Sequence, residues 1–183
     1  MGKDIHVHLT KLNKETNLYE ELVLYKQGEE YHYNEFGDKI IDNPNVKKVP
    51  IYNGRNYEMF DGMKDGDETD GYGKFPWISI RLNSLEPNLK KEIEEKQGIQ
   101  GYFDFYETTL ADIKLYLNEH PTVVDYDAED WEERKEKGDQ KPQKINPIKF
   151  LYENIYNYKY FADNDWWEDE PLSSYKVLFY FDW

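Results

Sequence analysis

Apolar and polar residues alternate at the start of the chain, and apolar residues become dense at its end. The alternation over 4–10 has the period of two expected of a half-buried strand. Residues 18–25 predict a second strand, so the chain is expected to open with a hairpin that turns at 13–17. The final segment, 175–183, is rich in β-branched and aromatic residues and predicts a central strand.

Further extended segments are predicted between these two ends. A second hairpin is expected over 31–41 with its turn at 36–38. The Asn-Pro-Asn segment 43–45 should break the extended pattern, because these residues favour turns. The apolar segment 75–82 is expected to be a strand, and 102–106 to be a short strand or a turn.

Helical spacing predicts helices between the strands. A short helix is expected at 55–63, followed by a loop rich in Gly and Asp. Pro87 is suited to open a helix that lasts to Gln97, and Thr109 to cap a third. The fourth helix starts after Pro147 and has the clearest buried stripe. That stripe consists of Ile148, Leu151, Ile155 and Tyr158.

These elements predict an α+β fold. Its antiparallel or mixed sheet would contain the N-terminal and C-terminal strands, with three to four helices packed on it. A length of 183 residues fits one domain spanning 1–183. Two additions to it are expected: a mixed-charge insertion around 127–144, either an exposed helix or a flexible segment, and an acidic loop around 163–170.

Composition supports a folded chain despite a mean hydropathy of -1.00. Aromatic residues make up 17% of the sequence, and each can bury about 150–250 Å². The chain has no Cys, which excludes disulfides and thiol chemistry. It shows no apolar leader and no run near the ~20 apolar residues that span a bilayer, so we expect the cytoplasm of the producing cell and no membrane partner. No cofactor is expected.

The charge balance is strongly acidic. Lys and Arg number 23 against 38 Asp and Glu, which gives a formal net charge of -15. Such a chain repels nucleic acid and attracts basic surfaces. We therefore expect no direct nucleic-acid binding and a basic protein as partner.

Acidic residues gather in three runs. The first contains Asp61, Asp65, Asp67, Glu68 and Asp70, the second Asp125, Asp127, Glu129, Asp130, Glu132 and Glu133, and the third Asp163, Asp165, Glu168, Asp169 and Glu170. One interpretation is a solvated surface that aids solubility. The other is a set of carboxylates spaced like phosphates, because duplex DNA carries about one charge per 1.7 Å of axis.

Tryptophan residues are interleaved with these carboxylates. Exposed Trp is favoured as an anchor at protein interfaces, and an acidic rim would steer a basic partner towards it. The sequence therefore predicts a protein-binding surface. Its residues are Trp131, Glu132, Glu133, Asp165, Trp166, Trp167, Glu168 and Asp169.

Two His residues near the N-terminus suggest a different chemistry. His6 and His8 would point to the same face of a strand, so both imidazoles could reach one metal ion, with Asp4 or Asp104 as a nearby carboxylate. The alternative is an exposed strand face with both rings in water. Arg55 has two interpretations as well: it binds a carboxylate or phosphate of a ligand, or it forms an ion pair that anchors the short helix to the sheet.

Three motifs resemble a family of small phage and prophage proteins. They are Asp4-Ile5-His6, Gly54-Arg55-Asn56-Tyr57-x-x-Phe60 and Phe179-Tyr180-Phe181-Asp182. Members of that family start with a similar strand, carry an "RNYxLF" segment and end in an "FWFD"-like strand. The resemblance implies a phage-encoded accessory protein and no defined activity. This chain departs from the family at 101–105, where it lacks the family's His residues.

Together, these features predict a phage-encoded counter-defence protein. It would bind a basic, nucleic-acid-handling defence effector of the infected host, such as a CRISPR nuclease, and block its nucleic-acid channel or an activation step. This anti-CRISPR-like function would rest on nucleic-acid mimicry. Two alternatives stay open: a metal-dependent hydrolase using His6 and His8, and a non-catalytic phage accessory protein whose charge serves solubility.

Overall fold

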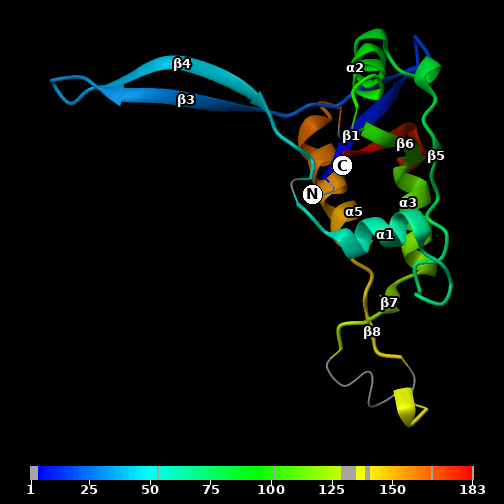
Figure 1. Ribbon diagram of the computed structural model, residues 1–183. Coiled ribbons are helices and arrows are strands. Elements are labelled where there is room, and N and C mark those ends of the chain that lie inside the picture. The colour runs from blue at the N-terminus through cyan, green and yellow to red at the C-terminus, as the bar shows by residue number, and fades with distance from the viewer. Residues whose placement is uncertain are drawn as a thin grey trace.

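The computed structural model describes residues 4–52, 54–100, 102–128, 135–138, 141–165 and 167–182. Within these residues, five strands form one antiparallel sheet with the order β2-β1-β9-β6-β5 (Figure 1). The strands are β1 (Asp4–Asn13), β2 (Leu18–Glu21), β5 (Ile78–Ser79), β6 (Tyr102–Thr109) and β9 (Tyr175–Asp182). Helices cover this sheet, so the predicted α+β fold is confirmed.

The two ends of the chain form the middle of this sheet. β1 pairs with β9 from Asp4 opposite Asp182 to Lys11 opposite Tyr175, and β6 pairs with the other edge of β9. Because β9 has neighbours on both sides and cover on both faces, every residue from Tyr175 to Phe181 is buried. The prediction of a central C-terminal strand is confirmed.

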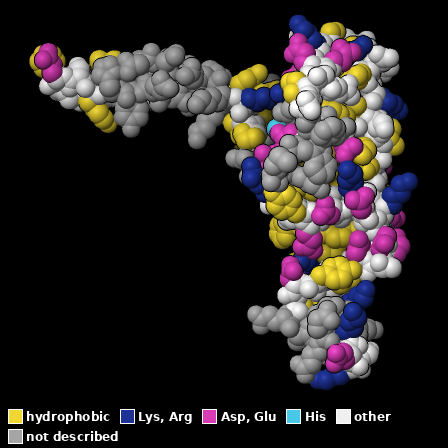
Figure 2. Space-filling view, in the orientation of Figure 1, with side chains coloured by type: hydrophobic (Ala, Val, Ile, Leu, Met, Phe, Trp, Pro, Cys, Tyr) yellow, Lys and Arg dark blue, Asp and Glu magenta, His cyan; other side chains and the backbone are white. Residues whose placement is uncertain are grey.

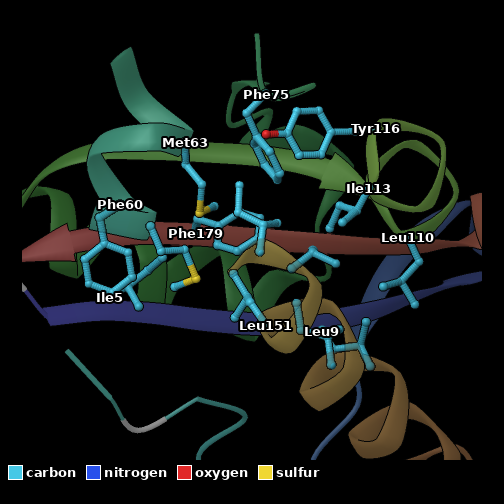
Figure 3. Close-up of a cluster of buried hydrophobic side chains, with 14 of the residues drawn as sticks. Ile5, Leu9, Phe60, Met63, Phe75, Leu110, Ile113, Tyr116, Leu151 and Phe179 are labelled. Carbon is cyan, nitrogen blue, oxygen red and sulfur yellow. The ribbon is translucent and has the colours of Figure 1, made fainter. Parts of the chain in front are cut away.

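One face of the sheet carries the larger apolar core. It is covered by α1 (Tyr57–Asp65), α3 (Leu110–Glu119) and α5 (Ile148–Ala162). Figure 3 shows Met63 of α1 pointing towards Phe179 of β9, while Phe60 of α1 lies beside Ile5 of β1. The four stripe residues predicted for α5 are all buried, and full burial of an Ile or Leu side chain contributes roughly 1.5–3 kcal/mol.

The opposite face of the sheet is partly polar. It is covered by α2 (Pro87–Gln97), which buries Leu89 and Ile93 against Leu178 and Tyr180. Strands alternate their side chains between faces, so His8 of β1 shares this face with Tyr180, which it contacts. The two faces therefore differ: one is an apolar core, and the other mixes a small apolar cluster with buried polar groups.

Local capping explains where the helices begin. The side chain of Thr109 accepts a hydrogen bond from the Asp112 N–H at 3.1 Å, as predicted for the start of α3. Asn56 caps α1 in the same way, with 2.9 Å to the Met59 N–H. α2 has the predicted bounds, with Pro87 at its first position.

A long hairpin leaves the body of the protein. β3 (Tyr25–Tyr33) pairs with β4 (Lys39–Lys48), and Figure 1 shows this ribbon projecting away from the sheet and helices. The expected break at 43–45 is wrong, because these residues lie inside β4 opposite 28–30. Both strands of a two-stranded ribbon are edges, and an edge strand tolerates a proline.

Other boundaries differ from the predictions. Only Ile78–Ser79 of the expected strand 75–82 is extended in the sheet, since Phe75 packs into the core and Pro76 has no N–H for a ladder. α1 extends to Asp65, further than predicted. β7 (Thr122–Val124) and β8 (Gln143–Ile145) form an additional small ribbon around the expected insertion.

Part of that insertion, 129–134 and 139–140, lies outside the described residues, so its expected form stays a prediction. Of the helices that the structure describes, none has the length and apolar character to cross a bilayer.

Candidate functional site

The acidic loop 163–170 connects α5 to the turn before β9, and its first residue is fixed in the interior. Asp163 has only 3% of its surface exposed. Its Oδ2 accepts a hydrogen bond from the Tyr175 hydroxyl at 2.5 Å, and its Oδ1 lies 3.1 Å from Lys11 Nζ. The Asp165 N–H also donates to Oδ1, at 3.0 Å. The start of the loop is therefore tied to β1 and β9.

These contacts set the charge state of Asp163. Burial alone would raise the pKa of this carboxyl, but the bonds from Tyr175, the Asp165 N–H and Lys11 outweigh burial and lower it. Burial and the bond to Asp163 raise the pKa of the Tyr175 phenol. Asp163 is thus held as a carboxylate that accepts hydrogen bonds, and it is not available to a partner.

The last residue of the loop is fixed as well. Glu170 Oε1 accepts a hydrogen bond from Lys14 Nζ at 2.5 Å, and the Glu170 side chain is only 9% exposed. Lys14 belongs to the turn between β1 and β2, and its contact with Glu170 raises its pKa. The two outer carboxylates of the predicted run therefore anchor the loop to the first hairpin and the central strand.

The inner part of the loop faces solvent. Asp165, Glu168 and Asp169 are exposed, and Trp167 is 66% exposed. A groove of about 520 Å³ separates this loop from the β1–β2 hairpin. Lysines and carboxylates from both sides line it, among them Lys11, Lys14, Glu15, Glu20, Asp165 and Glu168.

Four of the eight predicted interface residues therefore lie together on one anchored loop: Asp165, Trp167, Glu168 and Asp169. The other four, Trp131, Glu132, Glu133 and Trp166, lie outside the described residues. The anchors Lys11, Lys14 and Tyr175 were not predicted. The two lysines lie more than a hundred residues from their partners, so the available signal was weak: two lysines in the first hairpin of a strongly acidic chain.

Residues of the first and second acidic runs meet elsewhere. A hollow of about 420 Å³ is lined by Glu58, Asp61, Asp65, Asp70, Asp127, Tyr72 and Tyr126. Lys144 partly compensates this charge, with 2.8 Å to Glu58 and 3.6 Å to Asp125. This region lies near the start of α5, whereas 163–170 follows its end, and a 15-residue helix is about 22 Å long. The described carboxylates that line these two hollows thus form two separate acidic regions, one beside each end of α5.

His6 and His8 point to the same face, as predicted, and both rings stack on Tyr180. His6 Nε2 lies 3.1 Å from Asp182, while His8 Nδ1 lies 2.6 Å from Glu21. His8 Nε2 is 3.1 Å from the Tyr180 hydroxyl. Each imidazole therefore has its own carboxylate, and the described residues contain no group of three or more side chains placed to hold a metal ion.

The three motifs of the family resemblance meet at one end of the sheet. Arg55 Nε lies 2.7 Å from Asp4 Oδ1, so Arg55 forms the ion pair that was one of its two interpretations. The Asp4 N–H donates to Asp182, and Phe60 packs edge to face on Phe181. Each of the three motifs therefore has a structural role, because its residues contact those of another motif.

A buried charged cluster was not predicted. Lys176 and Glu107 are each 2% exposed, and their charged groups lie 3.2 Å apart. Arg81 also binds Glu107, at 2.6 Å, and Lys176 donates to the Ser84 hydroxyl at 2.9 Å. Burial lowers the pKa of Lys176, against the opposing effect of Glu107. A lysine inside an apolar strand was the available sequence signal.

Comparison of the chain with protein-family models, with curated proteins and with solved structures gives no match. The chemistry of the described residues therefore carries the functional argument.

Proposed function

We propose that this protein is a phage-encoded inhibitor that binds a basic, nucleic-acid-handling defence effector of the host through its 163–170 loop. The observation that carries the proposal is the exposure of Trp167 beside Asp165, Glu168 and Asp169, on a loop anchored at both ends. The phage context rests on the sequence resemblance. The proposed partner is an effector such as a CRISPR nuclease.

An anchored loop is well suited to binding. Ordering a mobile segment costs free energy on association, and the bonds of Asp163 and Glu170 reduce this cost by holding the loop before a partner arrives. Trp167 would supply the buried contact area, because aromatic residues are enriched among the few that dominate binding. The three exposed carboxylates would set the rate of encounter and its dependence on salt.

The charge of the whole chain favours a partner that normally holds nucleic acid. A net charge of -15 attracts a channel lined with Lys and Arg, and such channels exist to neutralise phosphates. The acidic region near the start of α5 would add long-range attraction to the contact made by the loop. A basic protein surface is therefore a better match than nucleic acid or an anionic membrane.

The test is binding to the purified CRISPR nuclease of the host, with and without its guide RNA, across a series of salt concentrations. We expect affinity to fall steeply as salt rises and duplex target DNA to compete with the protein. Trp167→Ala and the triple variant Asp165→Asn, Glu168→Gln, Asp169→Asn should both weaken binding by tenfold or more, the loss of roughly 1.4 kcal/mol.

A matched control removes the same charge elsewhere. Glu94, Glu95 and Glu119 are exposed residues of α2 and α3, and their triple replacement by Gln should change affinity far less than the loop triple variant. Equal losses in the two triple variants would mean that net charge alone acts. Binding that ignores salt, or unchanged binding by Trp167→Ala, would overturn the proposal.

A further inference from the structure

The end of the projecting β3–β4 ribbon is a built turn that presents an aromatic ring. Asn34 Oδ1 accepts hydrogen bonds from the N–H groups of Phe36 and Asp38, at 3.0 and 2.8 Å. Gly37 has a φ of 82°, a conformation that favours glycine and closes the turn. Phe36 is consequently held outward and is 81% exposed.

Carboxylates flank this ring. Glu35 and Asp38 are both exposed on the same turn, and Figure 2 shows acidic and hydrophobic side chains together at the end of the ribbon. The tip is therefore an apolar anchor with negative charge on both sides. An isolated two-stranded ribbon is at best marginally stable in water, so a ribbon of this length benefits from a surface to rest on.

A groove on the body has the complementary chemistry. It measures about 550 Å³ and lies between α3, α5 and β8. Its apolar lining includes Leu117, Pro121, Ile145 and Tyr152, and Ile145 is 53% exposed. Lys114 and Lys149 also line it, together with Glu153, whose carboxylate lies 3.9 Å from Lys149 Nζ, so two cations and one carboxylate flank the apolar part.

We propose that the tip of the β3–β4 ribbon of one copy docks into the α3–α5 groove of a second copy. Phe36 enters the apolar part of the groove, and Glu35 and Asp38 face Lys114 and Lys149. The tip does not reach the groove of its own chain, because strands of nine and ten residues carry it roughly 30 Å outward from the body (Figure 1).

Exchange in both directions closes the assembly as a symmetric dimer. A two-fold axis uses each contact twice, so two tips fill two grooves and neither surface stays open. The contact uses neither Trp167 nor its loop, so this dimer and the proposed inhibitory function stand or fall separately.

The experiment measures the mass of the full chain by sedimentation velocity from about 1 to about 100 μM, the range in which weak dimers form. We expect dimers for the natural chain and monomers for Phe36→Asp and for Ile145→Asp, each folded by circular dichroism. Phe161→Asp is the control, because Phe161 is 70% exposed on α5 and outside the groove; it should dimerise normally.

Mixing the two defective variants gives the sharpest result. A pair made of one Phe36→Asp copy and one Ile145→Asp copy keeps one of the two tip–groove contacts, so the mixture should regain dimers, weaker than those of the natural chain, that neither variant forms alone. A natural chain that stays monomeric throughout this range would overturn the proposal. Dimers that survive both substitutions, or a mixture that remains monomeric, would overturn it as well.

Discussion

The Tyr175 hydroxyl donates a 2.5 Å hydrogen bond to Oδ2 of Asp163, joining the start of the central strand to the first residue after α5. The rest of the acidic loop, 164–170, lies between these two residues. The bond therefore has two roles: it stabilises the fold, and it fixes the loop that carries Trp167. A variant that lacks this bond should therefore be less stable and should hold the loop less firmly.

Tyr175→Phe removes this bond and leaves Asp163 with Lys11 and the Asp165 N–H. We expect the free energy of unfolding at neutral pH to fall by about 1.5–3 kcal/mol, the range for hydrogen bonds to charged groups. Urea denaturation measures this loss. Tyr156→Phe is the control, because Tyr156 is 43% exposed. This substitution should lower the free energy of unfolding much less.

The same pair predicts a dependence on pH. The pKa of Asp163 is lower in the folded state, so its contribution is complete above the unfolded value of about 3.9 and disappears as pH falls through the folded pKa. The difference in stability between the natural chain and Tyr175→Phe should therefore shrink as the pH is lowered through this range. A constant difference between neutral and acid pH would contradict the assignment.

The buried pair Lys176–Glu107 should behave as one unit. Replacing Glu107 by Leu leaves an uncompensated cation in the interior, and such a change costs about 3–5 kcal/mol. Lys176→Met alone leaves Glu107 with Arg81 and should cost less. The double variant should be clearly more stable than the sum of the two losses predicts, as measured by a double-mutant cycle in urea. Additive losses would show that the two charges do not interact.

The cap of α3 offers a smaller and cleaner test. Thr109→Ala removes the oxygen that accepts the Asp112 N–H, so the free energy of unfolding should fall by about 1 kcal/mol. Thr109→Ser keeps the hydroxyl and should retain most of the stability. Thermal or urea unfolding of the three proteins measures the difference, and equal losses in both variants would indicate that packing, not capping, is responsible.

Local signals predicted much of the fold. Three features depend on residues that are neighbours in the sequence: the apolar stripe of α5, the Thr109 cap and the aromatic content of β9. They could therefore be predicted from the sequence alone. The β3–β4 ribbon was harder. Its Asn-Pro-Asn segment favours a turn, and only pairing with the opposite strand keeps it extended.

The candidate site was predictable only in composition. Acidic residues and Trp167 marked the 163–170 loop, but the sequence did not distinguish the carboxylates that anchor the loop from those that face solvent. That distinction depends on Lys11, Lys14 and Tyr175. The contacts of the two lysines with the loop span more than a hundred residues of sequence. Long-range ion pairs leave no periodic pattern.

The two imidazoles near the N-terminus give the last prediction. Both ring nitrogens of His8 have partners, Glu21 and Tyr180, and His6 faces Asp182, so binding a metal would break existing contacts. We expect Zn²⁺ and Mn²⁺ to leave the melting temperature unchanged relative to a chelator. His8→Ala should lower it, because the part-buried Glu21 carboxylate and the buried Tyr180 hydroxyl then lose a shared partner. A stoichiometric metal in the purified protein, lost in His6→Ala, would contradict this expectation and favour the hydrolase alternative.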